Sequence, residues 1–213
     1  GHYQCEDWLI DQLLNIGAAM PHYKHMQLPG IDHLGRNIDC PLTLKQVSSV
    51  AHQFGKKRVL CEIFGVSGHS MSFEEQKWIA DFHFALGITF INQHLTLYSM
   101  PGDRKRDYPP TISYHQPYWE DYKHLNDYFA RASYMLSQGE FVSDILLLHP
   151  IASAWSLKGL GLVDMDNPAL RDEEMEIRRY DRELQAVITT LLESHNDFDL
   201  GDESILEEHG RST

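Results

Sequence analysis

Arg58-Val-Leu-Cys-Glu-Ile-Phe-Gly65 is a run of β-forming apolar residues that ends on one carboxylate, Glu62, and breaks at Gly65. A second run, Gly87-Ile-Thr-Phe-Ile-Asn-Gln-His94, repeats this layout and has Asn92 and His94 at its exit. A β/α barrel places its catalytic groups at the C-terminal ends of its parallel strands. The two runs therefore predict neighbouring strands that bring polar side chains to one rim, where Glu62 is either a catalytic acid or an exposed acid paired with a Lys or Arg.

The overall charge argues against nucleic acid as a partner. The chain of 213 residues has a formal net charge of -13, which would repel a phosphate backbone. The basic cluster Arg104-Lys105-Arg106 is flanked by Asp103 and Asp107. A hydrophobic content of 42% is enough for a buried core, yet no run approaches the ~20 apolar residues that a membrane helix needs. We therefore expect a globular protein that binds neither nucleic acid nor a membrane. No leader segment is visible, and the sequence does not indicate a cellular location.

Cysteine and histidine spacing gives little support for a metal site. Cys5, Cys40 and Cys61 are odd in number and lack CxxC spacing, so we expect ordinary buried thiols. Imidazoles gather near the predicted loops, at His22, His25, His33, His69 and His94, with Asp32 among them. None has the HxxxH-with-Glu spacing of a helical zinc site. Neutral His and Asn at a barrel rim suit the recognition of hydroxyl groups, and a tyrosine such as Tyr23 suits the apolar face of a sugar ring.

Helical and strand patterns alternate along the first part of the chain. Apolar spacing predicts helices over 7–16 and 44–54, with a short strand over 18–26 and a loop at Pro29-Gly30. Ser72-Phe-Glu-Glu75 has capping-box spacing and opens a helix whose apolar stripe includes Trp78. After the second strand, a long polar loop over 98–117 precedes a helix over 119–137. Connections of that length are commonly functional.

The strand pattern restarts after Gly139. Residues 141–150 read as a fully buried strand of a parallel sheet, 168–195 as a long helix, and 197–200 as the next strand. We therefore expect a domain boundary between Gln138 and Val142, with residues 1–139 in one unit and 140–213 in another. A single βαβ unit lacks the rest of its sheet, so we interpret the chain as a fragment.

The chain resembles large bacterial glycoside hydrolases with a catalytic barrel, most of all those related to family 42 β-galactosidases and family 106 α-L-rhamnosidases. It is similar to the C-terminal half of the (β/α)8 TIM barrel and the start of the following domain. The matching segments are 20–23, 29–35, 59–65, 87–94, 131–139 and 144–150.

The resemblance implies several further features. The Glu62 strand would be the seventh of the barrel and the His94 strand the eighth, so Glu62 would stand where family 42 enzymes carry their nucleophile. The family 42 proton donor follows the fourth strand, and no residue here matches it. Residues from about Val142 would begin a flavodoxin-like or amidotransferase-like parallel α/β domain. Such a domain serves assembly in family 42 enzymes, so the resemblance also implies a homo-oligomer. Only the family 106 likeness implies calcium, and it identifies no ligands; no other cofactor is implied.

Our preferred interpretation is an α/β fragment of a glycoside hydrolase that cleaves O-glycosidic bonds of a carbohydrate substrate. Glu62 would be the nucleophile or general base. The residues expected to contact the sugar are His22, Tyr23, Asp32, His33, His69, Asn92 and His94. Two alternatives remain at this stage, a non-catalytic sugar-binding or assembly module and a metal-dependent hydrolase that uses the histidines.

Overall fold

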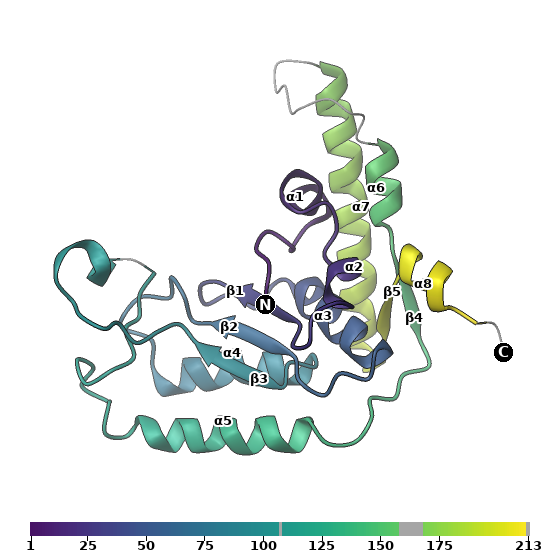
Figure 1. Cartoon of the computed structure of the whole chain (residues 1–213). Coiled ribbons are helices and arrows are strands. Elements are labelled where there is room, and N and C mark those ends of the chain that lie inside the picture. Colours follow the sequence, from purple (N-terminus) through teal and green to yellow (C-terminus); the bar gives the residue numbers. More distant parts are fainter. Residues whose placement is uncertain (107, 158–167, 212–213) are drawn as a thin grey trace.

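The computed structural model describes residues 1–106, 108–157 and 168–211, apart from the side chains at 104–105 and 168–175. The side chains of Arg104, Lys105 and Asp107, members or neighbours of the basic cluster, lie outside the described residues. The described strands form two parallel sheets, one of three strands and one of two, with helices packed around them (Figure 1). Among the helices in this part of the chain, none is long and apolar enough to cross a membrane.

The first sheet contains the two strands that the sequence predicts. Its members are β1 (Gly30–His33), β2 (Leu60–Ile63) and β3 (Phe90–Gln93), in the order β1-β2-β3 and all parallel. The helices α3 (Pro41–Gln53) and α4 (Phe73–Ala85) connect them. His2 makes one further parallel bridge to Gly30, on the other side of β1. The neighbouring parallel strands inferred from the runs at 58–65 and 87–94 are therefore confirmed.

The N-terminal part corrects one prediction. The helix over 7–16 is confirmed as α1 (Leu9–Asn15), but the expected strand over 18–26 is wrong, because it contains the short helix α2 (Met20–Tyr23). Pro21 lies in the first turn of α2, where its missing N–H costs nothing. The strand of the sheet starts instead at Gly30, which had been assigned to a loop. A Cβ there would lie 3.0 Å from the Leu60 side chain, so a larger residue at position 30 would require the Leu60 side chain to shift.

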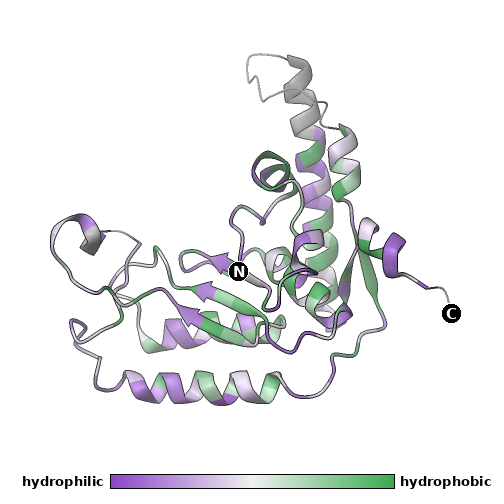
Figure 2. Ribbon diagram, viewed as in Figure 1, coloured by the Kyte–Doolittle hydropathy of each residue, from purple (hydrophilic) through white to green (hydrophobic). Residues whose placement is uncertain are grey.

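The capping box of α4 is confirmed, and so is its apolar stripe except at Trp78. The Ser72 hydroxyl accepts from the Glu75 N–H and the Glu75 carboxylate accepts from the Ser72 N–H. Trp78 was expected to face inward, but it is 55% exposed, since α4 packs through its neighbour Ile79. The helix α5 (Tyr122–Leu136) confirms the prediction over 119–137 and packs on α4, where the Tyr122 hydroxyl donates to Gln76 at 2.9 Å. Figure 2 shows hydrophilic and hydrophobic residues alternating along α5.

One face of the first sheet carries the core and the other is open. Ile31, Cys61 and Ile63 point to the helix side and are fully buried. Side chains alternate along a strand, so Leu60, Glu62 and their register partners lie on the opposite face. Phe90 on that face is 42% exposed. The described residues therefore leave one face of this sheet uncovered, whereas parallel sheets are normally covered on both faces.

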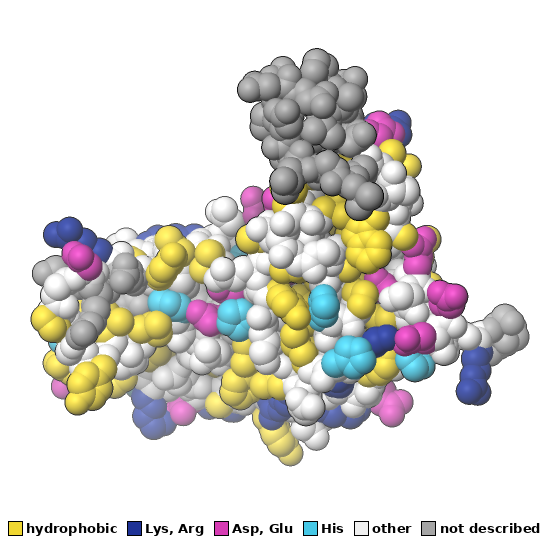
Figure 3. Space-filling model, turned by 45° about the horizontal axis from the view of Figure 1, so that its top comes forward, with side chains coloured by type: hydrophobic (Ala, Val, Ile, Leu, Met, Phe, Trp, Pro, Cys, Tyr) yellow, Lys and Arg dark blue, Asp and Glu magenta, His cyan; other side chains and the backbone are white. Residues whose placement is uncertain are grey.

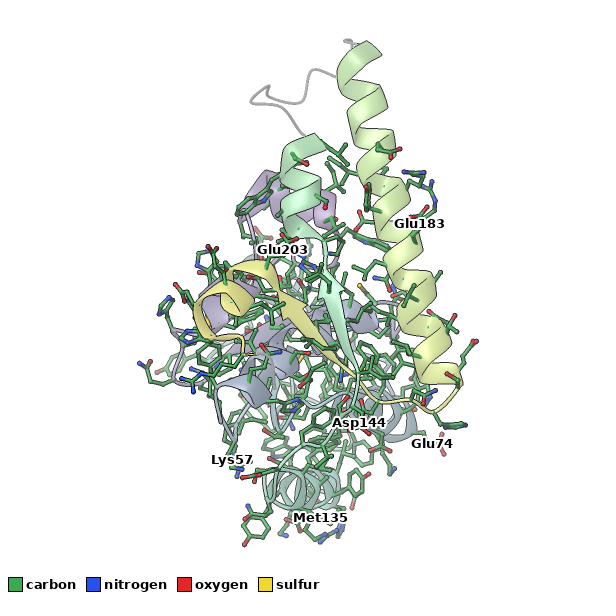
Figure 4. The ribbon with its side chains drawn as sticks, turned by 90° about the vertical axis from the view of Figure 1, so that its right-hand side faces the viewer. Lys57, Glu74, Met135, Asp144, Glu183 and Glu203 are labelled. Carbon is green, nitrogen blue, oxygen red and sulfur yellow. The ribbon has the colours of Figure 1, made fainter. Side chains whose placement is uncertain are left out.

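The second sheet follows the long segment after α5. It pairs β4 (Leu146–His149) with β5 (Asp199–Asp202), and its helices are α6 (Ile151–Leu157), α7 (Pro168–Glu193) and α8 (Glu203–His209). The strands near 141–150 and 197–200 and the helix over 168–195 are thereby confirmed. Figure 4 looks onto this sheet, with α7 along one side. The strand β4 is not fully buried as expected, because Leu146 and Leu148 are 53% and 48% exposed on its uncovered face.

The helix α3 lies between the two sheets. Its residues from Pro41 to Ala51 are all buried. The Ser49 hydroxyl accepts from the Leu200 N–H of β5 at 2.8 Å, and Lys45 lies over the rings of Phe141 and Phe198. The connection between α5 and β4 includes 138–142, so the domain boundary expected there stays a prediction.

The polar loop between β3 and α5 is held at its base. The Thr96 hydroxyl donates to the Ile112 carbonyl, and the Ile112 N–H donates to the Leu95 carbonyl at 2.8 Å. Its outer part contains the 3-10 helix η1 (Gly102–Arg106). In Figure 1 this loop projects beyond the arrowheads of β2 and β3, which are the C-terminal ends of those strands.

Candidate functional site

Glu62 lies at the centre of a group of polar side chains on the C-terminal half of the first sheet. The register places it between Asp32 on β1 and Asn92 on β3. Its Oε2 is 3.0 Å from Nε2 of His2, and its Oε1 is 3.8 Å from Nε2 of His94. The predicted placement of Glu62 on a parallel strand beside the one that leads to His94 is therefore confirmed. Figure 3 shows histidine and acidic side chains side by side on one face, between hydrophobic ones.

Asp32 supplies a second carboxylate beside Glu62. Neighbouring strands are about 4.8 Å apart, and partners in register point to the same face. Gln4 donates its side-chain N–H to Asp32 Oδ2 at 3.0 Å. The buried Oδ1 has no hydrogen-bond partner within the described residues. The sequence showed only one obvious carboxylate at the rim, because it did not reveal that Asp32 belongs to the strand next to β2.

The backbone is strained where β2 ends. Phe64 and Val66 have φ angles of 78° and 64° on either side of Gly65. A positive φ is uncommon outside glycine and is a clear outlier for a β-branched residue such as Val66. Strain of this kind persists only where surrounding contacts impose it, and it is frequent at functional sites. Here the turn brings the Gly65 backbone against His94, whose ring atoms would lie 3.5 Å from a Cβ at Gly65.

His94 connects Glu62 with the long loop. Its Nδ1 is buried, and no described atom hydrogen-bonds to it. Its ring meets the ring of Tyr108 edge-on, with 6.2 Å between centroids. The carbonyl of Pro109, next in the chain, accepts from the Gly68 N–H at 3.1 Å, so this part of the loop is tied to the turn after β2.

The other residues expected to contact a sugar fall into two groups. Asn92 and His69 are exposed, and the amide N–H of Gln116 lies 3.3 Å from His69 Nδ1. His22 is also exposed, and its ring lies 5.2 Å from that of Tyr3. These side chains are accessible, but only Asn92 shares the face of Glu62.

Tyr23 and His33 do not join the group around Glu62. Tyr23 is fully buried, and burial raises the pKa of its hydroxyl well above the usual value. His33 follows Asp32 directly, so it points to the helix side, where its ring packs edge-on against His83 with 4.6 Å between centroids. The alternation of side chains along β1 separates these neighbours in sequence.

Glu6 is a buried carboxyl that sequence reasoning missed. It is 1% exposed, and burial, with smaller contributions from Asp7 and Asp32, raises its pKa to about 8. Its backbone carbonyl accepts from the side chains of Gln12 and Gln46 at 3.0 and 2.8 Å. The glutamines Gln12 and Gln46, each within an amphipathic helix, indicate a buried polar network. The sequence does not indicate that this network holds Glu6.

An acidic groove of about 390 Å³ adjoins Asp32. It is lined by Gln4, Cys5, Asp7, Asp11, Asp32, His33, Leu34, Asn37, Asp39 and Cys40. This lining contains four aspartates and neither Lys nor Arg. Cys40 and Cys61 are buried as expected, but Cys5 is exposed, and its φ is 64°. In the described part of the chain, no group of three or more His, Cys, Asp or Glu side chains is placed to hold a metal ion.

The buried carboxyl of Glu6 should make folding stability fall as the pH rises. Its raised pKa means that the folded protein keeps a proton that the unfolded chain releases, so this contribution is complete below about 4.5 and is lost as the pH approaches about 8. Between pH 5 and pH 9 we expect the free energy of unfolding of the wild type to fall by an amount on the order of 2 to 4 kcal/mol because of Glu6. The side chain in Glu6→Gln does not titrate, so this part of the decrease should be absent from the variant. Urea unfolding at both pH values measures this, and the exposed Glu74, labelled in Figure 4, provides the control Glu74→Gln. An equal pH dependence in the wild type and Glu6→Gln would contradict the expectation.

Comparison with known proteins places more than half of this chain in a family. Residues 30–154, more than half of the chain, match the family described as alpha-L-rhamnosidase, Glyco_hydro_106. A protein of Formosa agariphila named putative beta-glucuronidase is 36% identical over 111 residues, which are 48% of this chain and 9% of that protein. The solved structure of a rhamnosidase from Novosphingobium sp. PP1Y matches with a TM-score of 0.54 and 20% identity, over 61% of this chain and 14% of that one.

The matched region contains the whole first sheet and β4. The chain spans only about a tenth of the length of these relatives. The resemblance to family 106 inferred from the sequence is confirmed, and the chain belongs to the glycoside hydrolase family 106 of α-L-rhamnosidases.

Proposed function

We propose that the full-length protein hydrolyses an O-glycosidic bond and that Glu62 is one of its catalytic carboxylates. The observation that carries this proposal is the position of Glu62 at the C-terminal end of a parallel strand, between two histidines and beside Asp32. The strained turn directly after β2 supports it. Family membership supports glycosidase chemistry in general.

We also propose that the first sheet is part of a (β/α)8 barrel. The bridge at His2 and the strands β1, β2 and β3 occupy four consecutive parallel positions. Their open face would be the barrel interior, covered by strands elsewhere in the full-length protein. The second sheet would begin the flavodoxin-like or amidotransferase-like domain, through which the protein would form a homo-oligomer. The likeness in fold to the Novosphingobium rhamnosidase supports the coarser assignment of this chain to part of a rhamnosidase-like α/β fold.

In the proposed reaction, Glu62 either attacks the anomeric carbon as a nucleophile or takes a proton from the water that attacks it, while a second carboxyl group protonates the departing glycosidic oxygen. Glycosidases pair two carboxyl groups across the scissile bond, and the charge of a carboxylate stabilises the oxocarbenium-like transition state. Asn92 and His94 lie next to Glu62 and would bind sugar hydroxyl groups. The described residues contain no group of three or more His, Cys, Asp or Glu side chains placed to hold a metal ion, and we derive no step through the calcium that the family resemblance implies.

The electrostatics of the site favour a neutral sugar over a uronic acid. Asp32, Glu62 and the aspartates of the groove are all acidic. Arg36, in the loop after β1, is already engaged by Glu75 at 2.7 Å and by the Ser67 carbonyl at 2.8 Å. A glucuronate carboxylate about 5 Å from one of these acids would be repelled by roughly 3 kcal/mol at an effective dielectric of 20. We therefore propose a neutral glycoside such as a rhamnoside as the substrate.

A comparison of two chromogenic substrates tests this choice. We expect the kcat/KM of the full-length protein for nitrophenyl α-L-rhamnoside to exceed that for nitrophenyl β-D-glucuronide by about 100-fold or more, corresponding to about 2.7 kcal/mol. A preference for the glucuronide would overturn the neutral-substrate proposal. Sugar binding without hydrolysis of any nitrophenyl glycoside would instead favour the non-catalytic alternative.

A further inference from the structure

The contacts of His2 determine how its ring can bind Glu62. Its Nδ1 lies 3.2 Å from the carbonyl oxygen of Tyr3, and its Nε2 lies 3.0 Å from Glu62 Oε2. A carbonyl oxygen only accepts hydrogen bonds, so Nδ1 carries a hydrogen when it makes this contact. The remaining contact then requires one more proton between Nε2 and Oε2, bound to one atom or the other. The pair therefore shares a proton.

His2 is positioned for this contact by the backbone. Its parallel bridge to Gly30 sets it beside β1, although Glu62 is one strand further away. Gly30 lies in register between His2 and β2 and has no side chain above the sheet. The ring of Tyr3, the next residue, packs against the rings of His22 and Tyr23 at 5.2 and 6.4 Å. The contact between His2 and Glu62 thus reaches across β1, from the level of Gly30 to the level of Asp32.

The two oxygens of Glu62 are not equivalent. Oε2 lies 3.0 Å from Nε2 of His2, whereas Oε1 lies 3.8 Å from Nε2 of His94, beyond hydrogen-bonding distance. Asp32 on β1 is the other acidic group in register, and the Cys61 thiol lies on the opposite face of β2.

We propose that His2 is a positioning residue that holds Glu62 through Oε2 and shares a proton with it, so that Glu62 reacts through Oε1. This inference rests on the proposed function of Glu62 and specifies how that carboxylate is oriented. It assigns a role to the segment before α1, which the sequence did not single out.

Two substitutions of His2 separate its contributions. In the full-length protein, His2→Phe removes the donor, and we expect kcat to fall about 10- to 100-fold with KM within about threefold, because the carboxylate loses its orientation rather than a substrate contact. His2→Gln places an amide N–H near the position of Nε2 and should recover at least about 10-fold of that loss. The exposed His25 provides the control His25→Phe, which should leave both constants unchanged.

The pH profile distinguishes proton sharing from simple structural support. A glutamine does not titrate, so one limb of the kcat profile should shift in His2→Gln and not in His25→Phe. Equal kcat in His2→Phe and the wild type, or an unshifted profile in an otherwise rescued His2→Gln, would overturn this inference. Glu62→Gln is measured in parallel: if it stays active, the proposed function fails, and if it is inactive while His2→Phe is not, only the role of His2 fails.

Discussion

Glu62→Gln in the full-length protein is expected to lower kcat by at least about 10³-fold while the protein stays folded. The amide has nearly the same shape as the carboxylate, but it can neither carry the negative charge that stabilises an oxocarbenium-like transition state nor accept a proton from water. Steady-state kinetics with the preferred nitrophenyl glycoside measures the effect, with thermal unfolding as the check on folding. The exposed Glu120, just before α5, offers the matched control Glu120→Gln.

A folded Glu62→Gln variant with near wild-type turnover would show that Glu62 is structural. His94→Ala should have a smaller effect, equivalent to about 1 to 3 kcal/mol, because it would remove a hydrogen bond to the sugar and not the reacting group. A larger loss in His94→Ala than in Glu62→Gln would reverse the two assignments.

Acid should destabilise the fold through two buried histidines. Burial lowers the pKa of His83 to about 3 and that of His149 to about 4. In the unfolded chain both histidines are protonated below about pH 6.5, whereas in the folded protein they stay neutral until the pH reaches their lowered pKa values. Their stabilising contribution is present above about 6.5 and is lost as the pH falls toward 4 and 3. The loss is on the order of 3 to 5 kcal/mol for each histidine, a large part of a typical folding free energy.

Denaturant unfolding at pH 7, 5.5 and 4.5 tests this expectation. His83→Gln and His149→Gln remove one titrating group each, so each should make the stability depend less steeply on pH, even if the variant is less stable at pH 7. His25→Gln changes an exposed histidine and should leave the dependence unaltered. Parallel curves for the wild type and both buried variants would contradict the assignment.

Local signals predicted the strand carrying Glu62. An apolar run that stops at an acid and a glycine, followed by a capping box at Ser72, lies within a short stretch of sequence. Pro21 carried a local signal as well, but the apolar residues around it suggested a strand over 18–26. The exposure of Trp78 could not be predicted from spacing alone, because the face of α4 that packs depends on where the sheet lies.

The rest of the site depends on pairing between distant segments. Asp32 meets Glu62, and His2 reaches across β1, only because of the strand register. A register cannot be read from one strand at a time, and a shift by one residue would exchange the two faces. The same alternation explains why Asp32 joins the group while the adjacent His33 does not.

The position of α3 limits how far this protein can be divided into modules. The helix presents one side to β1 and another to β5, and it is buried over nearly its whole length. A cut at 138–142 would strip β5 and the ring of Phe198 from α3 and leave Lys45 without its partner Asp197. If the second sheet were exchanged for that of a relative, α3 would have to be redesigned at the same time. The other side of α3 packs against the first sheet, which carries Glu62.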